Sequence, residues 1–249
     1  MDCFEALASA IAGRRPAKLV TVIAGQAGQV GRHLLLGPDG IITSEGTYPQ
    51  SLVETALHQE KAGLITVDGL TAYVEPYLPP PRLLVVGAGH VAQPVAHLGK
   101  LTGFDVTVMD DRPEYATPAR FPDAGQVLCG ELVQTLLAQN PGPGDFAVLV
   151  TRGHHLDMDC LRAIITRPLA YIGMIGSRNR VETVYRLLQE DHGIDPALFA
   201  RVHAPIGLDV GARSPGEIAV AIAAELLLAR HGGTAQPLSR LERRPVHRR

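Results

Sequence analysis

The chain has 249 residues, a length that fits one large domain or two domains of unequal size. Hydrophobic residues make up 46% of it and charged residues 19%, which excludes a wholly disordered chain. The net charge of −2 hides a basic end, because residues 234–249 carry five arginines and one glutamate (+4) and the rest therefore sums to −6. A mildly acidic body gives no nucleic-acid footprint, and we expect the basic tail to be disordered.

The three cysteines are Cys3, Cys129 and Cys160, and they form no CxxC pair. This usage favours a reducing compartment over a disulfide framework or a zinc knot. The N-terminus lacks the features of a signal peptide, and no apolar stretch approaches the roughly 18 residues that cross a bilayer. We therefore expect a cytoplasmic protein with no membrane partner. Cys129 could touch a cofactor or carry sulfur, but a small buried residue is its expected role.

Residues 1–78 predict a small α+β domain. Helices are expected at 4–12 and from 49 to about 61, and strands at 19–23, 30–36 and 41–43. Asp68-Gly69 predicts a tight primed turn between strands at 64–67 and 70–75. Prolines at 76, 79, 80 and 81 stiffen the segment that follows, which makes it the predicted domain boundary.

Residues 82–233 alternate between apolar strands and helices. The predicted strands are 83–86, 106–109, 126–129, 147–150 and 170–175, and the predicted helices are 91–101, 132–139, 157–165, 177–189 and 215–230. Such alternation indicates an α/β fold with a Rossmann-like parallel sheet, whose strands are apolar because helices cover both faces. A ligand would then bind outside the carboxyl ends of the strands.

A glycine-rich loop follows the first of these strands and opens the next helix, with the sequence Gly87-Ala88-Gly89-His90-Val91-Ala92. This GxGxxA pattern suits a nucleotide cradle: Gly87 permits the tight turn, and Gly89 lets the backbone approach a pyrophosphate at the helix N-terminus. His90 could donate to a phosphate or a bound cofactor, or it could be a plain helix-cap residue. A cradle that binds nothing is the alternative to a functional one.

An acidic pair closes the next strand, about 20 residues on, as Rossmann domains require. Asp110 could accept the two hydroxyls of a ribose, whereas Arg112 could neutralise a 2′-phosphate. These two features conflict, so the sequence does not choose between nucleotides. Asp111 and Arg112 could equally form a surface ion pair.

Polar residues also follow the fourth strand, in the run Thr151-Arg152-Gly153-His154-His155-Leu156-Asp157. Arg152 suits a phosphate or carboxylate, and Thr151 and His154 are further candidates for contacts in the crevice. Adjacent histidines diverge on most backbones, which weakens a metal site, and no metal ligands are predicted. Asp157 could contribute hard ligation or cap the next helix.

Two further glycine-containing segments are candidate ligand contacts. Gly173, Gly176, Ser177 and Arg178 lie where the fifth strand meets a helix, and Ser177 can cap that helix while arginines add charge. The alternative is an ordinary strand–helix junction that contacts no ligand. Gly207 lies in a shaped loop before the last helix, which Ser214-Pro215-Gly216-Glu217 is expected to start and cap.

Together these motifs resemble the XdhC/CoxI family, the accessory proteins of xanthine dehydrogenase and related molybdenum hydroxylases. The resemblance covers residues 83 to about 231 and rests on five segments in family order, namely 87–92, 110–114, 151–154, 171–178 and 205–211. It implies a chaperone that binds molybdenum cofactor (molybdopterin or its dinucleotide), assists its sulfuration by a cysteine desulfurase and delivers it to the apo-hydroxylase. The family's first domain commonly carries a Ser-Gly-Gly-Cys-type stretch, but residues 45–54 here contain no cysteine, so no thiolate ligand for molybdenum is implied.

The residues themselves leave two other functions open. An NAD(P)-dependent oxidoreductase would need a proton donor beside the nicotinamide, for which His90 or His154 would be the candidates. A non-catalytic nucleotide-binding scaffold would need neither. No nucleophile–base–orienter triad or zinc-protease motif is present, so no catalytic residue is predicted. A homodimer is compatible with the sequence, which fixes no oligomeric state.

Overall fold

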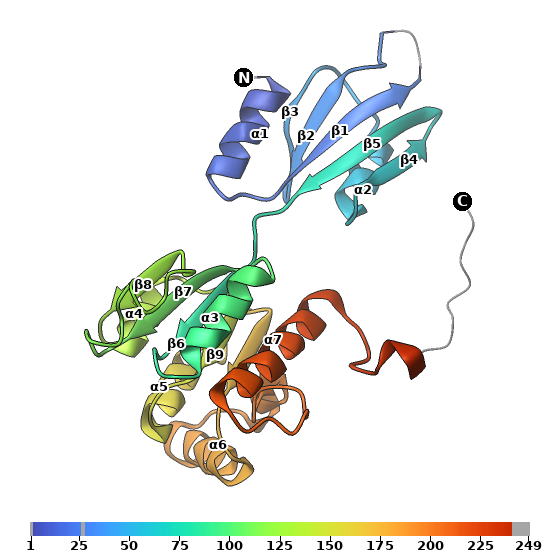
Figure 1. Cartoon of the computed structure of the whole chain (residues 1–249). Helices are drawn as coiled ribbons and strands as arrows, with labels where there is room; N and C mark the ends of the chain where they lie inside the picture. Colours follow the sequence, from blue (N-terminus) through green and yellow to red (C-terminus); the bar gives the residue numbers. More distant parts are fainter. Residues whose placement is uncertain (1, 26–27, 241–249) are drawn as a thin grey trace. The chain divides into compact units, whose positions relative to one another are not determined.

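The computed structural model describes residues 2–25 and 28–240 and divides the chain into Met1–Pro79 and Pro80–Arg249 (Figure 1). The division falls within the run of prolines that the sequence marks as a boundary. Most of the predicted basic tail, residues 241–249, lies outside the described residues. None of the helices in the described part of the chain is long and apolar enough to cross a membrane.

The first unit is an antiparallel sheet with the strand order β3-β2-β1-β5-β4. Its elements are α1 Cys3–Ala12, β1 Ala17–Ala24, β2 His33–Gly37, β3 Gly40–Ser44, α2 Gln50–His58, β4 Gly63–Val67 and β5 Leu70–Tyr77. Side chains alternate across the sheet, so one set packs on α1 around Leu19 and Leu35 and the other packs on α2 around Val20 and Leu34. The predicted α+β domain is therefore present.

Turn residues explain several agreements and differences between the predicted and observed elements of this unit. The primed turn between β4 and β5 is confirmed, since Asp68 and Gly69 both have positive φ, at 49° and 78°. The strand expected at 30–36 begins only at His33, because Gly31, with φ of 84°, lies in a turn just before it. The helix expected to reach Lys61 ends at His58.

The second unit is a six-stranded sheet with the order β11-β10-β9-β6-β7-β8, and every neighbouring pair is parallel. Numbered along this unit, the order is 3-2-1-4-5-6, that of a dinucleotide-binding Rossmann domain. The strands are β6 Arg82–Val86, β7 Asp105–Asp110, β8 Gln126–Cys129, β9 Phe146–Leu149, β10 Tyr171–Met174 and β11 Val202–His203. The helices are α3 Ala92–Leu101, α4 Leu132–Ala138, α5 His154–Ile164, α6 Arg178–His192, η1 Pro196–Arg201, α7 Pro215–His231 and η2 Leu238–Arg240.

Both faces of this sheet are covered by helices, which explains why its strands are apolar throughout. Leu83 and Val85 point to the face that α3 and α7 cover, whereas Leu84 and Val86 point to the face of α4, α5 and α6. The capping box predicted for α7 is confirmed, with the Ser214 side chain accepting from the Glu217 N–H and the Glu217 side chain accepting from the Ser214 N–H.

Three details of the second unit differ from expectation. Helix α5 begins at His154 rather than Asp157, with Gly153 as its N-cap. The two-residue strand β11 was too short to predict from periodicity. The expectation that Cys129 is buried is wrong: it is exposed, and it ends β8, one of the two edge strands of the sheet.

Candidate functional site

A cavity of about 380 Å³ lies at the carboxyl ends of β6 and β9. These strands are neighbours in the sheet, but the chain runs from β6 outward on one side and returns to β9 on the other, so this is the topological switch point where Rossmann domains bind ligands. The cavity is lined by Gly89, His90, Val91, Arg112, Tyr115, Val150, Thr151, Arg152, Ile175, Gly176 and Arg180. Polar groups thus meet apolar ones, as in most small-molecule sites.

The two glycines of the loop after β6 serve different purposes. Gly87 has a φ of 103°, and an added Cβ atom would lie 2.6 Å from the carbonyl oxygen of Val150. Gly87 therefore allows the loop to pack against the segment after β9. An added Cβ at Gly89 would meet nothing within 4 Å, and Gly89 lines the cavity. Its missing side chain consequently leaves open space over the backbone, as a cradle for a ligand requires.

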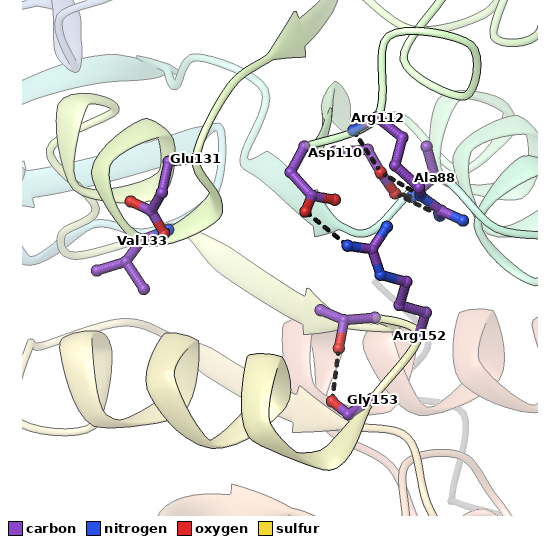
Figure 2. Close-up of polar contacts among 9 residues, drawn as sticks. Ala88, Asp110, Arg112, Glu131, Val133, Arg152 and Gly153 are labelled. Carbon is purple, nitrogen blue, oxygen red and sulfur yellow. Dashed lines mark hydrogen bonds and ion pairs between the residues drawn. The ribbon is translucent and has the colours of Figure 1, made fainter.

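Asp110, the last residue of β7, is buried and fully engaged by internal donors (Figure 2). Its Oδ1 accepts from the backbone N–H of Arg112 at 3.0 Å and from Arg112 Nε at 2.8 Å. Its Oδ2 accepts from the backbone N–H of Ala88 at 2.7 Å and from Arg112 Nη2 at 2.9 Å. Asp110 thus ties the glycine loop and Arg112 to the end of β7.

These hydrogen bonds determine the charge state of Asp110. Burial alone would raise the pKa of this carboxyl, but the hydrogen bonds from Arg112 and Ala88 lower the pKa to about 2. Asp110 is therefore ionised throughout the physiological range. The Arg112 guanidinium also lies 3.7 Å from the centroid of the Tyr115 ring, on which it is held by a cation–π contact.

A second ion pair joins the loops on either side of β6. Arg152 extends from the segment after β9 toward the segment after β7 (Figure 2). Its Nη2 lies 2.8 Å from Asp111 Oδ2. Because β9 and β7 flank β6 in the sheet, this pair spans the end of β6, from which the glycine loop leaves. The sequence-based alternative, a pair between Asp111 and Arg112, is wrong: each residue pairs with a different partner.

The third arginine is held by a carboxylate beneath the cavity. Asp157 is fully buried; its Oδ1 accepts from Thr151 Oγ1 at 2.6 Å and from the Thr151 N–H at 3.2 Å, and its Oδ2 pairs with Arg180 Nη2. Burial raises the pKa of Asp157, against the opposing effect of these hydrogen bonds. Asp157 thus anchors the segment after β9 and positions Arg180, whose Nε is buried without a partner among the described residues.

Comparison with known proteins assigns this unit to a family. The model of the XdhC Rossmann domain matches residues 83–226, more than half of the chain and all of the residues that line the cavity. The chain belongs to the XdhC family.

Two curated proteins are similar in sequence to this chain. The uncharacterized protein YqeB of Escherichia coli (strain K12) is 36% identical over 148 residues, which are 59% of this chain and 27% of that protein. A protein of Bacillus subtilis (strain 168) that is named as a probable xanthine dehydrogenase subunit is 37% identical over 158 residues, 64% of this chain and 46% of that protein. The chain therefore spans less than half the length of either relative.

A solved structure shares the fold. The crystal structure of a xanthine dehydrogenase from Bacillus halodurans superposes with a TM-score of 0.69 and covers 93% of this chain and 65% of its own. The identity is 22%, so this likeness supports the fold and nothing finer.

The cavity gathers only some of the residues that the sequence of this XdhC-family chain marks as ligand contacts. The residues that line it are Gly89, His90, Arg112, Thr151, Arg152 and Gly176. Gly87, Asp110 and Asp111 are not among the lining residues. Asp110 accepts hydrogen bonds from Ala88 and Arg112, and Asp111 pairs with Arg152. Ser177 caps α6, accepting from the Arg180 N–H, and Arg178 is exposed in the first turn. The side chain of His154 lies outside the described residues.

Two predicted glycines lie in packing positions instead. A Cβ at Gly173, in the middle of β10, would lie 2.3 Å from Ile206 Cδ1, so this glycine makes room for the loop before α7. Gly207 has a φ of 103° and its N–H donates to Glu225 at 2.7 Å. Neither residue is among those that line the cavity. Their proposed role as ligand contacts stays a prediction.

Tyr115 lines the cavity but was not among the predicted contacts of this site, whereas Arg180, which also lines it, was expected to add charge beside Arg178 at the start of α6. Tyr115 follows Arg112 by three residues in a turn, and the Arg112 guanidinium is stacked on its ring. Arg180 lies two residues after Arg178, which places the two side chains on different sides of α6. The capping role of Ser177 defines the start of this helix and so indicates which side each arginine is on.

Chemically, the cavity offers cationic donors beside an apolar wall. Among the described residues, no group of three or more His, Cys, Asp or Glu side chains is arranged to hold a metal ion. Arg112, Arg152 and Arg180 suit phosphate or another anion, and Tyr115, Val150 and Ile175 suit a flat ring. A ligand with both features fits this arrangement.

Proposed function

We propose that this chain is a maturation chaperone that binds molybdenum cofactor as its cargo. In this role it assists the sulfuration of the cofactor by a cysteine desulfurase and its insertion into a xanthine dehydrogenase-type molybdenum hydroxylase. The observation that carries the proposal is the match to the XdhC Rossmann domain over the segment that forms the arginine-lined cavity. The relative named as a probable xanthine dehydrogenase subunit supports it.

The residues of the cavity fit such a cargo. Molybdopterin carries a phosphate and a polar ring system, which call for cationic donors and a partly apolar wall. Arg112 and Arg152 would hold the phosphate end, Gly89 leaves the backbone open to it, and Tyr115 and Ile175 would contact the ring system. A cavity of about 380 Å³ lies at the small end of the range for ligand sites, so it suits one compact ligand.

An NAD(P)-dependent oxidoreductase is less well supported. The strand order and the glycine loop favour a dinucleotide, but the acid that would accept the ribose hydroxyls, Asp110, has its hydrogen-bonding capacity filled by Arg112 and Ala88. His90 lines the cavity and would be one candidate proton donor, whereas the side chain of His154, the other candidate, lies outside the described residues. A non-catalytic nucleotide-binding scaffold would require the same free acceptor for its ribose.

A maturation assay in cells tests the proposal. A xanthine dehydrogenase would be expressed, with and without this chain, in a host that makes molybdenum cofactor but lacks its own XdhC-family protein. We expect the hydroxylase to gain both molybdenum content and activity when the chain is present. Gly89→Val should abolish the gain, whereas Arg186→Gln, on the exposed side of α6, should preserve it. Equal activity and metal content with and without the chain would refute the proposed function.

A further inference from the structure

The three arginines of the cavity differ in how firmly their aspartates hold them. The Asp110 side chain is 3% exposed in its pair with Arg112, and the Asp157 side chain is 0% exposed in its pair with Arg180. In the third pair, solvent reaches both partners, since Arg152 is 47% and Asp111 30% exposed. Exposed ion pairs contribute little to stability, so Arg152 is the arginine that a ligand can most easily capture.

The position normally used to bind a ribose is closed in this chain. A carboxylate offers about four lone-pair sites, and the four donors from Arg112 and Ala88 occupy those of Asp110. A ribose hydroxyl could bind there only by displacing Arg112, whose guanidinium is also stacked on Tyr115 at 3.7 Å. The side-chain hydrogen bonds of Arg112 among the described residues use Nε and Nη2, which leaves Nη1 as a donor for a ligand in the cavity that Arg112 lines.

Asp111 forms an ion pair with Arg152, as a ligand anion would. Its carboxylate oxygen lies 2.8 Å from Arg152 Nη2, a normal length for a charge-assisted hydrogen bond. The two residues come from different loops, 41 positions apart, and their pair spans the end of β6 beside the cavity. A phosphate that binds Arg152 through this Nη2 group therefore has to displace Asp111 from it.

We propose that Arg152 binds the terminal phosphate of the ligand, that Asp111 takes the place of this phosphate in the free protein, and that the Asp110–Arg112 pair excludes a ribose. Asp111 is then an internal competitor that weakens anion binding, and Asp110 is a specificity-determining residue that acts through Arg112. The inference rests on the proposed function for the nature of the whole ligand, but it concerns only the group recognised at this corner of the cavity.

Titration with inorganic phosphate tests the competitor role. Backbone amide signals of residues 87–91 and 151–153 would be followed by NMR at constant ionic strength, in chloride buffer. Asp111→Asn should bind phosphate about twofold to fivefold more tightly than the unmodified protein, the size of a released surface ion pair. Arg152→Gln should bind it about tenfold more weakly or worse, because a charged hydrogen-bond donor is lost.

Matched controls separate this effect from a general change in charge. Asp123→Asn removes the same charge from an exposed pair with His97 elsewhere on the unit, and Arg186→Gln removes an exposed arginine of α6. Both should leave the phosphate affinity unchanged. An Asp111→Asn variant that binds phosphate no more tightly than the unmodified protein, or that gains no more than Asp123→Asn does, would overturn the competitor role.

Titration with NAD⁺ tests the exclusion of the ribose. We expect NAD⁺ to bind no more tightly than inorganic phosphate, and an affinity about tenfold greater would overturn the exclusion. These binding results are independent of the maturation assay. If phosphate and NAD⁺ bind as expected but the hydroxylase is not matured, the proposed function alone is refuted. If the hydroxylase is matured but Asp111→Asn binds phosphate as the unmodified protein does, this inference alone is refuted.

Discussion

At the scale of single residues, Gly87 and Gly89 are two positions apart but should respond differently to substitution. Gly89→Val places its side chain in open cavity space, so we expect loss of phosphate binding with an unchanged melting temperature. Gly87→Ala should lower stability by about 1–3 kcal/mol, because its φ of 103° is strained for alanine and its Cβ would contact Val150. Thermal unfolding and phosphate titration of both variants check this pair. Retained phosphate affinity in Gly89→Val would contradict the cradle.

Asp110 should make stability depend on pH in the acid range. Its pKa is about 2 in the folded protein, below the ordinary value of 3.8, so its contribution is complete above pH 4 and declines as the pH falls toward 2. The shift corresponds to about 2 kcal/mol, which Asp110→Asn should lose at pH 7. Urea unfolding at several pH values checks this. We expect the difference from the unmodified protein to shrink below pH 4, and a constant difference would count against the assignment.

Residue-level partners were the least predictable feature of the site. The sequence places Asp110, Asp111, Arg112 and Arg152 at one edge of the sheet, because parallel strands end together there. Which aspartate pairs with which arginine depends on side-chain rotamers, and one of the two pairs joins loops 41 residues apart. Local sequence patterns carry no information about such a choice.

At the scale of elements, a carboxylate on α7 fixes the loop that precedes this helix. Glu225 Oε2 accepts from Tyr171 Oη at 2.6 Å and from the Gly207 N–H at 2.7 Å, and Oε1 lies 3.1 Å from His203 Nδ1. Burial would raise the pKa of Glu225, but its hydrogen bonds from His203, Tyr171 and Gly207 lower it, so the carboxylate is ionised. Three segments therefore meet at one side chain.

Glu225→Ala should detach this loop. We expect a loss of about 2–4 kcal/mol, because a buried hydroxyl and an N–H lose their acceptor, and faster hydrogen exchange at residues 203–211. Glu190→Ala is the control, since the contact of Glu190 among the described residues is an exposed pair with Arg186 one helical turn away. Equal stability of the two variants would show that the loop is held by other contacts.

Elements with a clear apolar pattern were predicted well and short ones were not. The apolar strands β6, β7 and β9 have several consecutive buried residues, and their continuous apolar runs and flanking turns define them. Strand β11 has two residues, and the start of α5 at His154 depends on Gly153 as an N-cap without a side-chain hydrogen bond. Neither feature produces a residue pattern from which it could be predicted.

At the scale of the whole molecule, each described hydrophobic core belongs to one unit. The cores around Val20 and Leu19 use residues up to 77, and those around Val85 and Leu84 use residues from 83 onward. A fragment of residues 80–249 should therefore fold alone and bind phosphate as the full chain does. Circular dichroism and the phosphate titration check this. An unfolded fragment would mean that the second unit depends on the first.

The general organisation followed from the sequence because it depends on repeated features. Alternating strands and helices specify a doubly wound sheet, the glycine loop specifies its first crossover, and the run of prolines marks the change of unit. The cargo does not follow in the same way, since one fold serves many ligands and a site must be argued from its own groups.

We propose that the arginine-lined cavity holds molybdenum cofactor. The most direct test is mass spectrometry and metal analysis of the full chain, purified from a host that makes this cofactor, beside Gly89→Val purified in the same way. We expect a pterin phosphate and molybdenum to accompany the unmodified protein and to be absent from the variant. NAD(P) in place of the pterin, or a pterin equally abundant in the variant, would contradict the claim.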